Sequence, residues 1–284
     1  MNFKSLDDLM QSITDTLPEI RSSGPYDYIV GVPRSGVTPA ANIAIMLGVP
    51  YADLTSFVRG AANGHQTTLP ILPNSRVLLV DDTSSMGSAM KAAYKTLMTA
   101  HPTMEVTRYV VWSAPDTDPA HYDICSGVVP KPRMFEWNIW KIETHIKDPV
   151  HGVYPVAFDM DGVFCRDPNQ HENDKGSKLI EYYKTAPAKF LPSKPVAYII
   201  TNRLERNREY TEQWLIDHGI QWGELLMKEK ENEGHIDHKV RKVQMVSGNI
   251  SMYVESDDRQ ARMIADRVSG LPVWCVDSRH LYND

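Results

Sequence analysis

The chain has 284 residues, of which 42% are hydrophobic, and this is enough for two ordinary domains with packed cores. The first 150 residues hold 12 basic and 15 acidic side chains and the rest hold 18 and 21, so each half carries −3 and neither is a basic domain that grips nucleic acid. No apolar run is long enough to span a membrane, the N-terminus does not resemble a secretory signal, and three scattered cysteines predict a reducing, cytoplasmic compartment.

The first half of the chain alternates short β-branched runs with amphipathic stretches. In chain order it predicts a helix at 4–20, a strand at 26–32, a helix at 37–47, a strand at 51–58, a strand at 76–82, a helix at 88–100 and a strand at 106–112. Because strands that alternate with helices form parallel sheets, this half predicts one α/β domain.

The second half repeats the alternation. It predicts strands at 153–159, 196–202, 224–228, 250–256 and 272–277, and helices at 176–185, 205–218, 237–247 and 259–268. Pro149, Gly152 and Pro155 mark a boundary, and we expect domains at 1–148 and 149–284. The predicted fold class is therefore α/β, with two parallel-sheet, doubly wound domains.

Asp159 and Asp161 form the most informative pair in the second half. They follow the strand at 153–159, and residues i and i+2 of an extended segment share a face. Two carboxylates that converge repel each other unless a cation or a proton lies between them. A hard divalent ion, completed by a substrate phosphate, is the natural occupant, and Gly162 permits the turn that follows.

Three further strand ends and helices carry groups suited to phosphate chemistry. Thr201 ends a strand and offers a hydroxyl to a phosphoryl oxygen. Lys239, or Lys242 as the alternative, offers a positive charge to the transition state. Glu255, with Asp257 or Asp258 behind it, offers carboxylates to a metal.

The order of these four elements resembles the haloacid-dehalogenase superfamily over roughly residues 154–280. The resemblance implies a phosphatase with Asp159 as the nucleophile, Asp161 as the general acid and base, and Thr201 and Lys239 as the second and third motifs. It also implies Mg²⁺ held by these carboxylates: Asp159, Asp161, Glu255 and Asp257. The run at 225–242 is loosely similar to the 3′-phosphatase half of polynucleotide kinases.

Two turns of the first half are suited to a sugar phosphate. The strand at 76–82 ends in Asp81 and Asp82, whose carboxylates can accept hydrogen bonds from ribose hydroxyls, and a hydroxyl-rich turn leads into the next helix. N–H groups at a helix start bind anions, so this turn suits a phosphate. The turn from Pro33 to Gly36 follows the strand at 26–32 and suits a pyrophosphate.

Over about residues 25–140 these turns resemble type I phosphoribosyltransferases, whose sugar-pyrophosphate motif typically reads DDxxxTGxT. The resemblance implies that phosphoribosyl pyrophosphate (PRPP) is bound by residues of both turns: Arg34, Ser35, Gly36, Asp81, Asp82, Ser84, Ser85, Gly87 and Ser88. Segment 58–68, with Arg59, is similar to the loop that closes over the site. Phe135 and Trp137 are similar to base-stacking aromatics of xanthine-guanine enzymes, or they are core aromatics at a domain junction.

Two positions depart from the pattern of that family. Ser85 stands where the purine enzymes have an Asp, and a hydroxyl is no base for purine N7. Met86 stands where the motif has a Thr, and Met has no hydrogen-bond donor. The alternatives are a pyrimidine or unusual base as substrate, another nucleophile, or a transferase site that has lost its activity.

Together the two halves predict a bifunctional enzyme of nucleotide metabolism. Its partners are small molecules, namely PRPP, a base or nucleotide, and a phosphomonoester, with no membrane partner. One alternative is a phosphatase regulated by a PRPP-binding sensor, and another is a nucleic-acid 3′-phosphatase, which the even acidic charge argues against. The short gaps between the phosphatase motifs leave no room for a cap, so we expect cover from the first domain, from a second subunit of a homodimer or from a large substrate.

Overall fold

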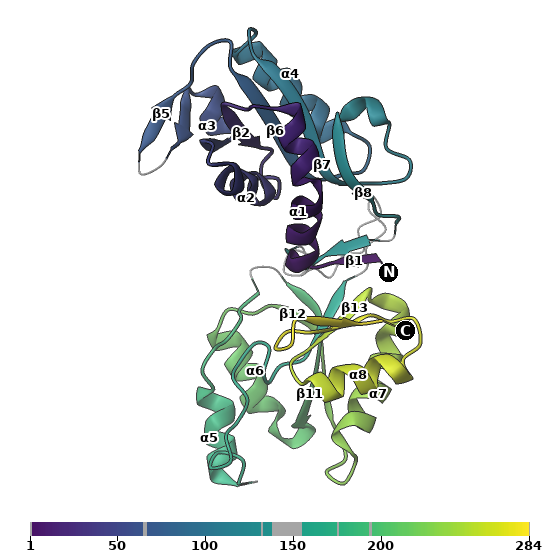
Figure 1. Cartoon of the computed structure of the whole chain (residues 1–284). Coiled ribbons are helices and arrows are strands. Elements are labelled where there is room, and N and C mark those ends of the chain that lie inside the picture. Colours follow the sequence, from purple (N-terminus) through teal and green to yellow (C-terminus); the bar gives the residue numbers. More distant parts are fainter. Residues whose placement is uncertain are drawn as a thin grey trace. The chain divides into compact units, whose positions relative to one another are not determined.

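The computed structural model describes residues 2–64, 67–131, 133–137, 155–174, 176–192 and 195–283 (Figure 1). The chain divides into two compact units, Asn2–Arg133 and Met134–Asp284. Most of the stretch that we expected to hold the boundary, 145–155, lies outside the described residues, so the domain limits at 1–148 and 149–284 stay a prediction.

The N-terminal unit is built on a seven-stranded sheet. Its helices are α1 (Leu6–Ser23), α2 (Val37–Leu47), α3 (Leu54–Val58) and α4 (Ser88–Ala100), with a short 3₁₀ turn, η1 (Pro119–His121). The strands of the sheet, in spatial order, are β5 (Thr68–Pro70), β4 (Ala61–Asn63), β3 (Tyr51–Asp53), β2 (Tyr28–Gly31), β6 (Arg76–Ser84), β7 (Glu105–Ser113) and β8 (Ile124–Val128). Strands β1 (Asn2–Lys4) and β9 (Arg133–Phe135) are not members of this sheet.

The strand order of this sheet locates its ligand edge. Strands β3, β2, β6, β7 and β8 run parallel to one another, and they stand in the order 2-1-3-4-5 along the chain. The order reverses between β2 and β6, and doubly wound sheets bind their ligands at the carboxyl ends of the strands beside such a point. The turn after β2 and the turn after β6 therefore lie at the expected position.

Local sequence explains how this unit is held together. Ser5 caps α1, and its hydroxyl accepts a hydrogen bond from Asp8 N–H while Asp8 accepts one from Ser5 N–H. Alternate residues of the central strands, such as Val30 and Leu79, pack in one core cluster with Leu97 of α4. The residues between them are also fully buried, as parallel sheets covered on both faces require.

The C-terminal unit is built on a six-stranded sheet. Its helices are α5 (Ser177–Thr185), α6 (Arg208–Asp217), α7 (His235–Val246) and α8 (Asp258–Arg267), with 3₁₀ turns η3 (Glu205–Asn207) and η4 (Ser247–Asn249). The strands, in spatial order, are β12 (Trp222–Lys228), β11 (Val196–Leu204), β10 (Val156–Phe158), β13 (Met252–Glu255), β14 (Val273–Cys275) and β15 (His280–Tyr282). In Figure 1, α5 and α6 lie on one side of this sheet and α7 and α8 on the other.

The strand order again marks one edge of the sheet. Five parallel strands stand in the order 3-2-1-4-5 along the chain, and the order reverses between β10 and β13. Asp159 follows β10 directly and Glu255 ends β13, so both lie at the reversal. Ala157 and Tyr253 of these strands pack against α7 and α8 in one core cluster, which fixes the two strand ends relative to each other.

Three predictions about elements need correction. Residues 54–58 are helical, because the Asp53 carboxylate accepts hydrogen bonds from the N–H groups of Thr55 and Ser56 and so caps a helix start. Six strands were not predicted, because each is only three to five residues long: β1, β4, β5, β8, β9 and β15. The sheets are not wholly parallel, since β4 and β5 in one and β15 in the other pair antiparallel.

Candidate functional site

Asp159 lies at the centre of the candidate site in the C-terminal unit. Its carboxylate accepts a hydrogen bond from Lys239 Nζ at 2.7 Å, and the same ammonium donates to Glu255 Oε2 at 2.6 Å. Asp159 is 3% exposed and Lys239 is 2% exposed. One buried cation therefore bridges the two carboxylates at the strand-order reversal, although the three residues are up to 96 positions apart in the chain.

Burial and charge shift the protonation of these groups. Burial and the charge of Glu255 raise the pKa of Asp159 well above its ordinary value, although Lys239 opposes this. Burial alone would lower the pKa of Lys239, but the charges of Asp159 and Glu255 raise it above its ordinary value. The Lys239 ammonium therefore lies between two buried carboxyl groups, and their mutual repulsion favours a proton on Asp159.

Asp161 is held by a different cation. The Arg203 guanidinium donates to Asp161 Oδ1 from Nη2 at 2.7 Å and to Oδ2 from Nε at 3.0 Å, and the Tyr182 hydroxyl donates at 3.0 Å. Burial alone would raise the pKa of Asp161, but the charge and hydrogen bonds of Arg203 lower it. Arg203 is the residue that sequence reasoning missed, and its position two residues after Thr201 is the signal that could have found it.

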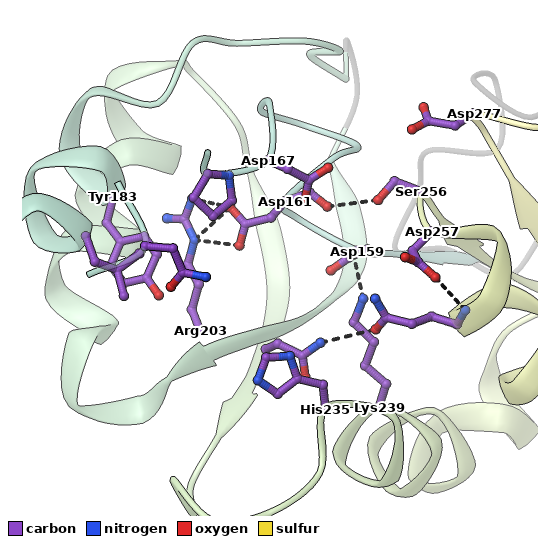
Figure 2. Close-up of a pocket in the computed structure, with 15 residues that line it drawn as sticks. Asp159, Asp161, Asp167, Tyr183, Arg203, His235, Lys239, Ser256, Asp257 and Asp277 are labelled. Carbon is purple, nitrogen blue, oxygen red and sulfur yellow. Dashed lines mark hydrogen bonds and ion pairs between the residues drawn. The ribbon is translucent and has the colours of Figure 1, made fainter. Parts of the chain in front are cut away.

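A cavity of about 380 Å³ opens above these residues. Its wall includes Asp159, Asp161 and Asp257, and in Figure 2 Arg203 and Tyr183 lie on one side while Lys239 and Asp257 lie on the other. Carboxylate oxygens of this kind are the ligands that Mg²⁺ prefers. Asp159, Asp161 and Asp257 therefore supply the ligand type of a divalent ion, although among the described residues only Glu229, Glu233 and His238 bring three such ligand atoms together.

The structure distinguishes the predicted metal ligands from one another. Asp257 lines the cavity, and one of its oxygens accepts the Gln260 N–H at the start of α8. The Asp258 carboxylate instead accepts hydrogen bonds from the hydroxyls of Ser278 and Tyr282. Glu255 is fully buried, and its Oε2 accepts from Lys239 while its Oε1 accepts the N–H groups of Ser256 and Asp257, so it positions that lysine.

Two other predicted residues do not face the cavity. Thr201 is fully buried, its hydroxyl oxygen accepts the Arg203 N–H at 3.2 Å, and Asn202 and Arg203 form the wall at this strand end. Lys242, the alternative to Lys239, is paired with Glu229. Of the two lysines, Lys239 is the one that contacts Asp159.

The turn after β2 packs against strand β6, and Gly36 makes this contact possible. A Cβ added to Gly36 would lie 2.6 Å from the Val32 carbonyl oxygen and 2.8 Å from that of Val80. Such contacts are impossible, so only glycine allows the turn after β2 to pack on β6 beside Val80. Helix α2 begins directly after Gly36 and has no side-chain cap, while Arg34 is exposed and Ser35 is half-buried.

The acidic pair of this site is almost fully buried. Asp81 and Asp82 are 6% and 4% exposed, and Asp81 accepts a hydrogen bond from the Asp82 N–H at 3.0 Å. Burial and the neighbouring charge of Asp82 raise the pKa of Asp81 to about 9. A bound sugar hydroxyl or a cation would relieve this repulsion.

The phosphate turn is shorter than predicted. Strand β6 continues through Ser84, which pairs with Ser113 of β7 because the two strands stay in register beyond the acidic pair. The turn therefore consists of Ser85, Met86 and Gly87, and Ser88 is the first residue of α4. Helix α4 has no side-chain cap, so its N-terminal N–H groups suit an anion.

The remaining predicted residues of this site are those of the closing loop and of the base-stacking pair. Arg59 directly follows α3, and segment 58–68 includes strand β4 and the start of β5, which form a hairpin, with residues 65–66 outside the described part. Phe135 and Trp137 stack on each other with ring centroids 5.1 Å apart, and both belong to the C-terminal unit. Their use in stacking a base stays a prediction.

Comparison with known proteins identifies the first half of the chain. The phosphoribosyl transferase domain model matches residues 3–148, which is just over half of the chain. No curated protein sequence is significantly similar. Within the described residues, no helix has the length and hydropathy needed to cross a membrane.

Several solved structures are similar to this chain. A purine phosphoribosyltransferase from Pyrococcus horikoshii is 19% identical with a TM-score of 0.37, and the alignment covers 48% of this chain and 92% of that one. A xanthine-guanine-hypoxanthine phosphoribosyltransferase from Helicobacter pylori is 15% identical with a TM-score of 0.38 and the same coverages. An orotate phosphoribosyltransferase from Aeropyrum pernix is 19% identical with a TM-score of 0.33, covering 43% and 71%.

These likenesses are too low to carry an argument about substrate, and the family match carries the assignment. That match supports phosphoribosyltransferase chemistry on small molecules, within nucleotide metabolism. The matched region contains both turns at the strand-order reversal, with the buried pair Asp81 and Asp82. The chain therefore belongs to the phosphoribosyl transferase domain family.

Proposed function

We propose that the chain is bifunctional, with phosphoribosyl transfer at the N-terminal site and Mg²⁺-dependent phosphomonoester hydrolysis of the haloacid-dehalogenase type at the C-terminal site. The observation that carries the second half is the Lys239 bridge between Asp159 and Glu255. A buried carboxylate at a strand-order reversal, held by one lysine at the edge of a cavity, is a group positioned to attack a phosphate.

The reaction would proceed in two balanced steps. An Asp159 oxygen attacks phosphorus, the bond to the leaving oxygen breaks, and the leaving oxygen takes a proton from Asp161. Water then attacks phosphorus, Asp161 takes up the water proton, and free phosphate leaves as the Asp159 carboxylate is restored. Lys239 supports both steps, because its ammonium contacts the attacking carboxylate.

Arg203 decides when Asp161 can act as an acid. In the structure the guanidinium favours the ionised carboxylate, which is the form that accepts a proton. Asp161 can donate only after it has gained a proton and Arg203 has moved from it to another anion. The substrate phosphate is that anion, since Arg203 also lines the cavity and guanidinium binds phosphate in the same bidentate manner.

Mg²⁺ would be held by Asp159, Asp161 and Asp257, and its charge would neutralise the phosphoryl oxygens during transfer. The same ion type would accompany PRPP at the N-terminal site, beside Asp81 and Asp82. There the α4 start would bind the 5′-phosphate and the turn from Arg34 to Gly36 would bind the pyrophosphate. A nucleophile then attacks C1 of the sugar, the C1–oxygen bond breaks and pyrophosphate leaves.

One specific observation favours a second candidate, in which the N-terminal unit senses PRPP without consuming it. Met86 is 73% exposed in the phosphate turn, where the family motif has a Thr that donates a hydrogen bond. Ser85 also replaces the carboxylate that serves purine enzymes as a base. Both changes would weaken transfer while leaving the buried acidic pair to bind a ribose.

The two candidates are separated by supplying PRPP, Mg²⁺ and a panel of purine, pyrimidine and unusual bases. Pyrophosphate and inorganic phosphate are measured separately. Pyrophosphate release that depends on one base supports transfer. Saturable PRPP binding with no pyrophosphate release under any base supports the sensor, and absence of PRPP binding contradicts both.

A further inference from the structure

The C-terminal site continues into a second cavity. The first, about 380 Å³, holds Asp159 and Lys239, and the second, about 440 Å³, reaches Lys228. The two cavities share five wall residues: Asn173, Leu179, Tyr183, Asn202 and His235. They therefore adjoin, and the second is itself large enough for part of a small-molecule ligand.

The second cavity follows the carboxyl edge of the sheet. Lys228 is the last residue of β12 and pairs with Leu204 of β11, which also lines this cavity. Asp159 follows β10, on the other side of β11. A ligand in both cavities would extend from the reacting carboxylate across two strand ends.

Lys228 is a buried cation whose ammonium makes few hydrogen bonds. It is 3% exposed, and in the part of the chain that the structure describes its ammonium donates one hydrogen bond, at 3.5 Å, to the Glu231 carbonyl. An ammonium has three donors, so this leaves donor capacity towards the cavity. Burial lowers the pKa of Lys228, although the charges of Glu233 and Glu231 oppose this.

The other charges of this cavity largely cancel. Arg206 and Glu231 pair with each other at 3.0 Å, and burial lowers the pKa of His235, which favours its neutral form. Lys228 therefore supplies the surplus positive charge among the ionisable groups that line the second cavity. A buried, positively charged subsite selects an anionic group on the ligand.

This inference rests on the proposed phosphatase function. We propose that the substrate is a phosphomonoester whose leaving group carries a second phosphate, which binds Lys228 while the first phosphate reacts at Asp159. A small bisphosphate and the phosphorylated 3′ end of a nucleic acid share this chemistry. Hydrolysis of the reacting ester follows the two steps given above and leaves the second phosphate unchanged.

The test compares a matched pair of esters on the full chain with Mg²⁺. A nucleoside 3′-monophosphate and the corresponding 3′,5′-bisphosphate differ only in the second phosphate, and products are identified to confirm 3′ release. We expect kcat/KM to be about tenfold to a hundredfold higher for the bisphosphate, the range of one hydrogen bond to a charged group. An oligonucleotide with a 3′-phosphate forms a third arm, and preference for it over the bisphosphate would identify a nucleic-acid source.

Variants show whether Lys228 causes this preference. Lys228→Met should reduce the bisphosphate-to-monophosphate ratio towards one, and Lys228→Arg should retain most of it. Lys230→Met is the matched control, because Lys230 is exposed two positions away and should leave the ratio unchanged. A wild-type ratio near one, or a ratio that Lys228→Met leaves unchanged, overturns the second subsite. No phosphate release from any ester overturns the proposed phosphatase itself.

Discussion

Arg203 is the residue on which the geometry of the C-terminal site most depends. It is 1% exposed, and its guanidinium holds both oxygens of Asp161. Removing one partner of a buried ion pair leaves an uncompensated charge. A single side chain therefore joins the stability of this unit to the orientation of a group that reacts.

We expect Arg203→Met to lower the free energy of unfolding of the C-terminal unit by about 3 kcal/mol. Arg206→Met is the control, because the pair of Arg206 with Glu231 is exposed and contributes no more than about 1 kcal/mol. Urea unfolding of both variants checks this. Equal midpoints for the two variants would mean that Arg203 is not structurally coupled to Asp161.

His238 gives the same unit a pH dependence. It is fully buried, and burial lowers its pKa to about 4, although a hydrogen bond to the Thr201 carbonyl and the charge of Glu233 oppose this. Lys242 and Arg241 act in the same direction as burial. In the folded protein the imidazole is therefore neutral down to mildly acidic pH.

The free energy of unfolding should fall by up to about 3 kcal/mol as the pH falls from about 6.5 to about 4. Above 6.5 the imidazole is neutral in both states and contributes nothing to the dependence. Between the two values the unfolded chain takes up a proton that the folded chain does not. His238→Gln should flatten this part of the profile relative to wild type, and a profile unchanged by the substitution would refute the assignment.

At the scale of elements, Gly162 connects the turn after β10 to the end of β13. Its φ is +83°, and an added Cβ would lie 2.1 Å from Ser256 Oγ. The Ser256 hydroxyl in turn donates to the Asp161 carbonyl at 3.3 Å. A side chain at position 162 would therefore push apart the two loops that carry the reacting groups.

Gly162→Ala should destabilise the C-terminal unit by about 3 kcal/mol and reduce phosphate release. Gly219→Ala is the control for backbone strain alone, because Gly219 has a φ of +68° with open space around its Cα. We expect this substitution to lower the free energy of unfolding by about 1 kcal/mol. Thermal unfolding of the two variants gives the comparison. A loss at Gly219 as large as that at Gly162 would show that contact with Ser256 is unimportant.

The bounds of helices were predictable where the capping residues and the hydrophobic periodicity agree. The expected helices at 37–47 and 88–100 coincide with α2 and α4, since each follows a glycine that ends a turn. Residues 54–58 were misassigned because the cap at Asp53 outweighs the β-branched and aromatic residues after it. Sequence also placed Asp159 and Lys239 among the candidates, because Asp159 follows a strand and Lys239 lies in the first half of a helix.

Contacts across the sheet were not predictable from the chain. Arg203 and Asp161 are 42 residues apart, and only the pairing of β10 with β11 brings their side chains together. In the sequence, Lys228 is only the polar end of an apolar strand. Its position at the cavity depends on the register of β12 with β11, in which it pairs with Leu204. Ser84 was assigned to a turn because nothing local shows that β6 and β7 remain paired so far.

At the scale of the whole molecule, two compact units with separate ligands should respond separately to those ligands. PRPP with Mg²⁺ at a hundred times its Kd should stabilise the N-terminal unit by about 2.7 kcal/mol, visible as an upward shift of one calorimetric transition. Asp82→Asn should lose this shift. Equal shifts of every transition would contradict independent sites.

The central claim is that Asp159 attacks phosphate in one unit while the other unit handles PRPP. The most direct test measures Mg²⁺-dependent phosphate release and PRPP binding in wild type and in Asp159→Asn. We predict that phosphate release falls at least about a thousandfold, as for loss of a nucleophile, while PRPP binding is unchanged. Phosphate release that survives the substitution, or joint loss of both properties in a folded variant, would contradict the two-site account.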